Sequence, residues 1–402
     1  MDLLREGVEQ KAVIATALMR KLTVDGITRA CPVYMVRLDW LFYNDQNDRI
    51  ATWISQYRSE HGGQIPDIRD RARYNDIIEE FIVASNPDAI RKTQTNIEMV
   101  DQREPGVVLT DGRIIDGNRR FTCLRRLAKK NDRFNYFETV ILDRNIENDA
   151  RQIKMLELSI QHGEESKVDY NPVDRLVGIY NDIVENRLLS VEEYARSTNE
   201  SESEVRHRVE IAKLMVEFLE FINAPKQFHI ARDMQVASPL EELLKLMKKC
   251  HDEDEAEDLK IAVFVNMLMQ TASDMTRFIR NFKSIIGSPH QERFLEEQKE
   301  LAAGVIESLP PVGKMSTDVI REVVRAQSEV TEELDRSAEK AVLRARKSET
   351  RTRPIQLAEK ATNFIESIDV NILFKMNDSE LQRLSRQLAR LEEAIARVRE
   401  NL

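Results

Sequence analysis

The 402-residue chain has only 3 cysteines, Cys31, Cys123 and Cys250, and no two of them form a CxxC pair. This argues against a disulfide framework or a zinc site and fits a reducing compartment, so we expect a cytoplasmic protein. The 6 histidines are scattered, and no HExxH motif is present. We therefore interpret His207 and His229 as packing or surface residues rather than metal ligands.

Long apolar runs and a net positive charge are also missing. The longest apolar candidate, 261–269, is far shorter than the roughly 20 residues that span a bilayer, and residues 1–7 do not read as a signal peptide, so no membrane association is expected. The chain has 60 Lys and Arg against 70 Asp and Glu, a net charge of -10, and is not globally basic. Contact with nucleic acid would have to come from a local cluster of basic residues.

The sequence predicts an α+β chain that begins with a small α/β unit. Its 32% charged and 42% hydrophobic residues are typical of a soluble, helix-rich protein, and its length allows two or three domains. Apolar spacing predicts a helix, a strand, two helices and a further strand, at residues 3–22, 31–41, 50–57, 75–83 and 136–142. From about residue 146 the pattern is almost wholly helical, with one long amphipathic helix at 259–286 and the best linker candidate at 309–313.

The stretch 107–124 is the most informative one. An Asp-Gly dipeptide at 111–112 separates two apolar runs and predicts a β-hairpin, and the apolar spacing becomes helical after Gly117. Arg119 and Arg120 therefore lie at a predicted helix N-terminus, where backbone N–H groups favour anions and a guanidinium can bind a phosphate with two parallel hydrogen bonds. The pattern favours a phosphate-binding corner and, equally, a surface turn with solvated arginines.

Two capped helix starts follow. Asn171 and Pro172 combine a side-chain cap with a proline at the first helical position. A Ser-x-x-Glu box at Ser190 opens a short helix to about Ser197, and a longer helix begins near Glu202. This spacing is that of a DNA-binding helix-turn-helix, although the local pattern alone favours an ordinary αα-hairpin.

The C-terminal segment carries a heptad pattern behind a helix cap at Asn377. Its apolar residues are spaced alternately three and four apart: Leu381, Leu384, Leu388, Leu391, Ile395, Val398 and Leu402. This seam predicts a short coiled coil and hence a homodimer. The alternative is a helix packed antiparallel within its own subunit.

In their order these elements resemble the ParB family of partition proteins, over roughly residues 33–222. The stretch 38–49 is similar to the first box of that family, 115–121 to its glycine–arginine–arginine phosphate box, and 156–161 with 168–172 to its third box. Residues 188–215 lie where the family places its helix-turn-helix, and the heptads fit a dimerisation end in kind.

The resemblance implies a ParB/sulfiredoxin-like N-terminal domain that binds CTP and Mg2+, a helix-turn-helix that binds DNA, and a dimer that acts as a switch or clamp on DNA. It also implies a role in plasmid partition or a mobile element, with a protein partner encoded nearby. The implied nucleotide-binding residues are Asn47, Arg49, Gly117, Asn118, Arg119, Arg120, Glu157 and Gln161, with Glu157 as the metal ligand. The implied DNA-binding residues are Ser201, Ser203, Arg206, His207, Arg208 and Lys213.

The predicted divisions of the chain follow from this assignment. They are an N-terminal helix (1–30), a nucleotide-binding domain (31–145), a helix-turn-helix domain (146–225), a helical domain (226–308), a linker with a polar helix (309–353) and a C-terminal dimerisation segment (354–402).

The chain departs from the family in its third box and in its length. Residues 162–167 are additional, and strict alignment places Leu158 and Ser159 where the family has a carboxylate and an amide that help to hold magnesium. Leu158 has no oxygen for a hard cation, so either Glu157 takes that place or metal binding and CTP hydrolysis are weak. The connection 57–102 is also longer than usual and is expected to form an added subdomain.

Three hypotheses of different classes remain. The leading one is a ParB-like, CTP-dependent DNA-binding protein. The second is a ParB-fold interaction or scaffold protein with reduced DNA binding, favoured by the acidic net charge and by glutamates that oppose phosphate approach, at Glu200, Glu202 and Glu204. The third is a nuclease or phosphotransferase with Asp116 or Glu157 as the acid near the phosphate corner, although no second carboxylate cluster has metal spacing.

Overall fold

The computed structural model describes residues 2–24, 26–163 and 171–401, and its N-terminal part is built on a six-stranded sheet with the strand order β1-β2-β6-β4-β5-β3. The strands are β1 (Val13–Val24), β2 (Ile27–Arg37), β3 (Phe42–Tyr43), β4 (Gly106–Leu109), β5 (Arg113–Asp116) and β6 (Tyr136–Leu142). β4 pairs with β6 and β3 with β5 in parallel, and the other neighbours are antiparallel. The sheet is therefore mixed, and with the helices that follow it the chain has the predicted α+β class.

Some of the predicted features lie outside the described residues. They are residues 164–167 of the additional stretch, residues 168–170 of the third box and the last heptad residue, Leu402.

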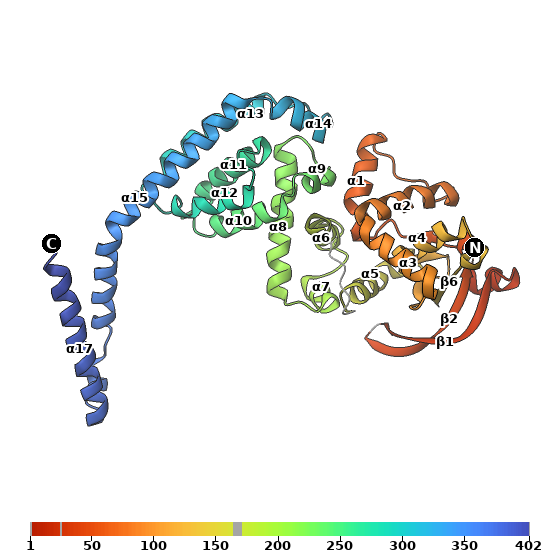
Figure 1. The fold of residues 1–402 in the computed structure, drawn as a ribbon, viewed down its shortest axis with the longest axis horizontal. Helices are drawn as coiled ribbons and strands as arrows, with labels where there is room; N and C mark the ends of the chain where they lie inside the picture. Colours follow the sequence, from red (N-terminus) through yellow and green to blue (C-terminus); the bar gives the residue numbers. More distant parts are fainter. Residues whose placement is uncertain (1, 25, 164–170, 402) are drawn as a thin grey trace.

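The helix predicted at 3–22, assigned as an N-terminal helix over 1–30, is wrong. In the described part of this segment, helix is limited to the π-helical turn Leu3–Gly7 and the two residues after it, and β1 follows. β1 pairs with β2 along most of its length, and the two strands form a long curved hairpin (Figure 1). The β-branched residues of this segment pack well on a pleated sheet, and the Asp-Gly dipeptide at 25–26 is the same turn signal that correctly predicted the β4–β5 hairpin.

Helices cover both faces of the sheet. They are α1 (Ala51–Glu60), α2 (Arg71–Ser85), α3 (Pro87–Val100), α4 (Asn118–Ala128) and α5 (Ile146–Gly163). Ile78 of α2 and Ile97 of α3 are buried in one core with Phe121 of α4, whereas Leu156 of α5 packs in a second cluster with Val107 of β4. The connection 57–102 therefore forms a wall of this domain and not a separate subdomain.

Every element after β6 in the described residues is helical. First come α6 (Pro172–Ile179), the π-helical turn η5 (Tyr180–Glu185), α7 (Val191–Thr198) and α8 (Glu202–Phe221). Then follow α9 (Phe228–Asp233), α10 (Ala237–Met247), α11 (Glu253–Met269), α12 (Met275–Asn281), α13 (Gln291–Glu307) and α14 (Thr317–Val319). The predicted caps Asn171 and Ser190 are confirmed, and Ser201 forms a further capping box with Glu204.

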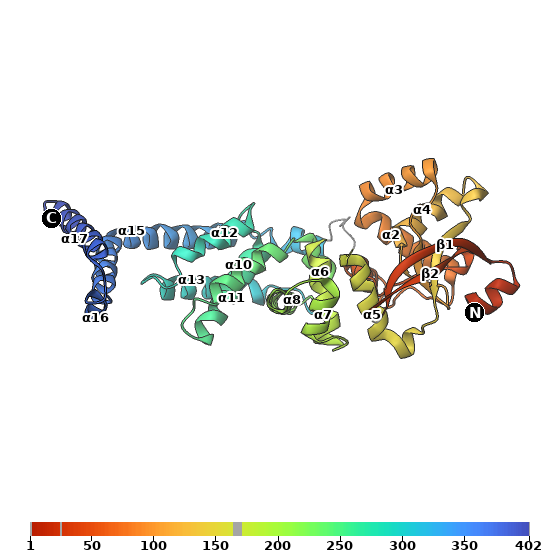
Figure 2. The same ribbon diagram turned by 90° about the horizontal axis from the view of Figure 1, so that it is seen from below.

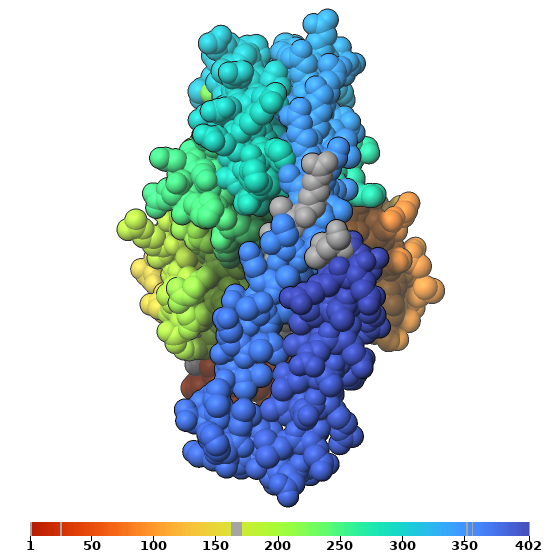
Figure 3. Space-filling view, turned by 90° about the vertical axis from the view of Figure 1, so that its left-hand side faces the viewer, coloured from red at the N-terminus to blue at the C-terminus, as the bar shows by residue number. Residues whose placement is uncertain are grey.

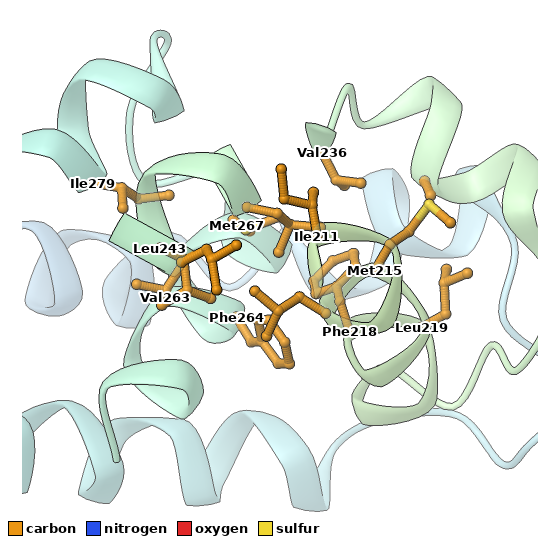
Figure 4. Close-up of a cluster of buried hydrophobic side chains, with 14 of the residues drawn as sticks. Ile211, Met215, Phe218, Leu219, Val236, Leu243, Val263, Phe264, Met267 and Ile279 are labelled. Carbon is orange, nitrogen blue, oxygen red and sulfur yellow. The ribbon is translucent and has the colours of Figure 1, made fainter. Parts of the chain in front are cut away.

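The helical part has its own hydrophobic core, shown in Figure 4. Phe218 of α8 and Phe264 of α11 meet there with ring centroids 5.4 Å apart. The single helix predicted at 259–286 is wrong, because α11 ends where Gln270 adopts a left-handed φ of 53° and α12 starts anew behind a side-chain cap from Asp274.

The predicted linker at 309–313 connects α13 to α14, but the core does not end there. Met315, Ile320 and Leu334 belong to the same buried cluster as α8. The first half of α15 (Ser328–Glu366) packs along this core, and its second half extends away from it (Figure 1, Figure 2).

The chain ends in a helical hairpin. After α16 (Val370–Leu373), α17 (Asp378–Arg399) begins at the predicted cap Asn377 and runs back beside the second half of α15 (Figure 3). Ile395 and Val398 of the heptad seam line a groove of about 950 Å³ with Leu357 of α15. The antiparallel arrangement within one subunit is therefore the one that the structure has. Among the described residues, no helix combines the length and apolar character that crossing a bilayer requires.

Candidate nucleotide-binding site

The three sequence segments that resemble the family boxes meet at one cavity of about 410 Å³. Asn47 and Arg49 line it from the turn after β3, Gly117, Asn118, Arg119 and Arg120 from the start of α4, and Gln161 from the end of α5. Seven of the eight predicted nucleotide-binding residues thus line the cavity, and Glu157 does not.

The turn after β3 is held by Asn47, which is buried. Its Oδ1 accepts a hydrogen bond from the backbone N–H of Arg49 at 3.0 Å and so starts the short turn η3 (Asp48–Ile50). Asn side chains commonly stabilise a turn in this way. The consequence is that Arg49 is presented to the cavity by a rigid turn.

Gly117 lets α4 begin directly at the cavity. Its φ of 101° is in the region that favours glycine, and a Cβ at this position would lie 2.8 Å from Cζ of Phe137. α4 then starts at Asn118, so the first turn of the helix lies on the cavity lining. The partial positive charge of this helix end favours a bound anion.

Arg119 is half-buried, and its guanidinium group is close to two other guanidinium groups of the cavity. Its burial and the neighbouring guanidinium groups of Arg49 and Arg120 lower its pKa to about 10. Within the part of the chain that the structure describes, no carboxylate lies within ion-pair distance of Arg119. A guanidinium in this setting stays protonated at neutral pH and gains stabilisation from an incoming anion.

Arg120 is held by two carboxylates. Its Nη2 lies 3.1 Å from Asp116 Oδ2 and its Nη1 3.4 Å from Glu104 Oε2. Asp116 also pairs at 3.0 Å with Arg20 of β1, a residue that the sequence did not single out because its segment reads as a helix. Asn118 Oδ1 and Arg120 Nε are buried without a hydrogen-bond partner among the described residues. Such atoms cost free energy until a ligand or water satisfies them.

Part of the cavity wall was missed by the sequence motifs. The polar residues concerned lie at the end of α2, at the cap of α3 and on α3; they are Ser85, Asn86, Thr93 and Asn96. They belong to the long connection 57–102. The one feature of the sequence that could have indicated them is that Thr93 and Asn96 are one helical turn apart and so lie on the same face of a helix. Their hydroxyl and amide groups can hydrogen-bond a base or a sugar.

Glu157 is buried and does not line the cavity. Its carboxylate accepts a hydrogen bond from Gln161 Nε2 at 3.1 Å and lies 3.8 Å from Lys154 Nζ, and burial raises its pKa to about 7. Leu158 is buried in the helical core, and no group of three His, Cys, Asp or Glu within the described ranges has the arrangement of a metal site. Within the residues that the structure describes, this cavity therefore has no set of carboxylates arranged for a magnesium ion.

The predicted DNA-binding residues lie at the start of α8, after a three-residue connection in which Asn199 has a left-handed φ of 55°. Four of these six predicted residues are exposed, namely Ser201, Ser203, Arg206 and Lys213. The other two, His207 and Arg208, are half-buried. Each basic side chain there pairs with a glutamate, and the pairs are Arg206–Glu202 (2.6 Å), Lys213–Glu210 (3.1 Å) and Arg208–Glu200. A phosphate would have to compete with these carboxylates.

Comparison with known proteins does not assign a family. No family model and no curated protein matches the chain. Among solved structures, a Pnob8-like ParB-N domain is similar, with 13% sequence identity and a TM-score of 0.38, over 71% of this chain and 98% of that one. A similarity of this extent does not establish a shared fold.

Proposed function

We propose that this protein is a ParB-like DNA-binding protein that is switched by a nucleoside triphosphate and works as a dimer. The observation that carries the proposal is the arginine-lined cavity, in which distant segments bring Arg49, Arg119 and Arg120 together at a helix N-terminus. A triphosphate offers these groups several anionic oxygens, including an acceptor for the buried Nε of Arg120. Titration calorimetry with the four ribonucleoside triphosphates is the direct test.

CTP is the proposed nucleotide, on the strength of the sequence resemblance. The hydroxyl and amide groups of Thr93 and Asn96 support a cavity that takes a base and sugar besides phosphates. Because Glu157 does not line the cavity and Leu158 is buried, hydrolysis of CTP is expected to be weak. In this proposal the nucleotide brings two N-terminal domains together over DNA bound by α7 and α8, and the C-terminal hairpin keeps the dimer joined.

Glu104→Gln is expected to strengthen CTP binding by up to about fivefold. Glu104 is an exposed partner of Arg120, and exposed ion pairs are worth about 1 kcal/mol or less, so removing this competitor makes Arg120 more available to phosphate. Calorimetry with the wild type, with Glu104→Gln and with the control Glu98→Gln, an exposed acid on α3 that does not line the cavity, measures the effect. A Glu104→Gln affinity at or below that of the control contradicts the assignment.

DNA binding is expected to depend on salt and on the start of α8. Charge reversal of Arg206 and Lys213 should weaken binding to all duplexes alike, because each phosphate contact contributes about 0.9 to the slope of log affinity against log salt. Changing Ser203 or His207 should instead alter the preference among sequences. Arg293→Glu on α13 is a matched control, since Arg293 forms the same kind of exposed pair with Glu297. The measurement is selection from random duplexes, with and without CTP, followed by binding at several salt concentrations.

The glutamate pairing of α8 favours a second function, a scaffold that binds a partner protein. If no duplex is enriched with or without CTP, and DNA is not retained even at about 50 mM salt, the α7–α8 pair is structural and the scaffold function replaces the first proposal.

A further inference from the structure

A buried lysine lies between the cavity and the α7–α8 pair. Lys154 of α5 is 6% exposed, and its Nζ lies 2.7 Å from Asp48 Oδ1, 3.5 Å from Asp182 Oδ2 and 3.8 Å from Glu157 Oε2. All three carboxylate residues are themselves buried. Removing an ammonium and three carboxyl groups from water together is costly, so this cluster contributes little to stability by itself.

Two of the three carboxylate residues are connected to residues that line the cavity. Asp48 is the residue between Asn47 and Arg49, which both line the cavity. Glu157 accepts the hydrogen bond from Gln161, which also lines it. A ligand that draws Arg49 or Gln161 toward itself therefore acts on carboxylates that hold Lys154.

Asp48 is also packed tightly against the helical part. A Cβ built on Gly178 of α6 would lie 2.6 Å from the Asp48 carboxylate. The carboxylate thus rests against α6 with no room for a larger residue, and it cannot shift without moving its contact with α6 or with Lys154.

The third carboxylate residue is hydrogen-bonded through its backbone to the segment that precedes α7. Asp182 lies in the π-helical turn η5, and its backbone C=O accepts hydrogen bonds from the N–H groups of Leu188 at 2.8 Å and Leu189 at 3.1 Å. These residues immediately precede Ser190, the cap of α7. π-helical turns are rare and occur frequently at functional sites.

The contact between Lys154 and Asp182, at 3.5 Å, is longer than the 2.7 Å hydrogen bond between Lys154 and Asp48. Asp182 Oδ2 is buried and, among the described residues, accepts no hydrogen bond, although the ammonium is 3.5 Å away. A buried acceptor without a hydrogen bond is unfavourable, so a small movement that shortens this contact would lower the free energy of the cluster.

We propose that Lys154 is a positioning residue that couples occupancy of the cavity to the placement of α7 and α8. Binding moves Asp48 and Glu157, Lys154 follows them, and Asp182 carries the change into the segment before α7. This inference rests on the proposed function, because it takes the ligand of the cavity to be a nucleoside triphosphate. The coupling is reciprocal: DNA held by α8 is then expected to change the affinity of the cavity for its ligand.

Asp182→Asn tests the coupling without leaving Lys154 unpaired, because two carboxylates remain beside the ammonium. Asp174→Asn is the matched control, since Asp174 is another buried aspartate at the same junction and accepts a hydrogen bond from the Thr52 N–H at 3.2 Å, away from Lys154. Hydrogen exchange of the full chain is measured over residues 180–198 with and without CTP, and calorimetry is run on the same samples. In the wild type and in Asp174→Asn, CTP should change the exchange of this segment. In Asp182→Asn, CTP should bind within about threefold of wild-type affinity and the change should fall by at least half.

Two results overturn the coupling: Asp182→Asn responding like the wild type, or Asp174→Asn losing the response to the same degree. Absence of CTP binding to the wild type instead overturns the proposed function, and the coupling is then decided by a cycle in the ligand-free protein. Gln161→Ala should change exchange over 180–198, and the change should disappear in the Gln161→Ala/Asp182→Asn double variant. Additive effects in this cycle overturn the coupling whatever the nucleotide result.

Discussion

Replacing Arg119 and Arg120 together by alanine is expected to reduce the affinity for CTP by more than tenfold. Charge-assisted hydrogen bonds contribute about 1.5–3 kcal/mol each, and about 1.4 kcal/mol corresponds to a factor of ten in affinity. Part of this gain is offset, because Arg120 must exchange Asp116 and Glu104 for phosphate oxygens. Arg119 has no such carboxylate partner among the described residues and should account for the larger share of the loss.

Titration calorimetry of the wild type and the double variant measures this effect. Arg126→Ala is the matched control, because Arg126 lies on the same helix, is exposed and does not line the cavity. The control should bind CTP like the wild type. The nucleotide assignment is wrong if the wild type binds none of the four ribonucleoside triphosphates. It is also wrong if the double variant has unchanged affinity.

Removing residues 378–402 is expected to convert a dimer into a monomer, so that the mass in solution falls to about half. Although α17 packs beside α15, much of its apolar seam stays in contact with water: Leu381 is 39% exposed and Leu388 is 38% exposed. Exposed apolar residues at heptad spacing are buried most readily by another helical surface, and a second copy of the hairpin offers a matching one. Light scattering of the full and shortened chains gives the two masses directly.

Two substitutions separate loss of the seam from loss of the helix. Leu381→Glu with Leu388→Glu places charge on the exposed seam and should dissociate the dimer, whereas Gln382→Glu with Gln387→Glu adds the same charge off the seam and should not. An unchanged mass for the shortened chain and for the seam variant would show that the hairpin packs only within its own subunit.

Local chemistry explains which elements could be predicted. The β4–β5 hairpin, the start of α4 after Gly117 and the caps Asn171, Ser190 and Asn377 each depend on a few neighbouring residues, and the structure has all of them. The arginine corner belongs to the same class, because a glycine turn, two arginines and a helix start are contiguous in the chain.

Features that depend on distant partners could not be predicted from local patterns. β1 is a strand because β2 pairs with it, and a single segment cannot show its partner. The long apolar pattern at 259–286 does not reveal the left-handed residue Gln270 that divides it. α3 became a wall of the cavity because Ile97 is buried beside Phe121.

The charged cluster around Lys154 is a further feature that the sequence does not reveal. In the sequence Lys154 and Glu157 are ordinary neighbours on a helix, and nothing marks Asp48 or Asp182 as their partners. Folding brings three carboxylates within ion-pair distance of one ammonium by closing loops of different length. The turns, the caps and the contiguous phosphate corner can be predicted from the sequence, because they are local backbone and side-chain preferences. The walls of the cavity, the burial of Glu157 and the link to α7 required the tertiary structure, because each depends on which distant surfaces bury their apolar residues together.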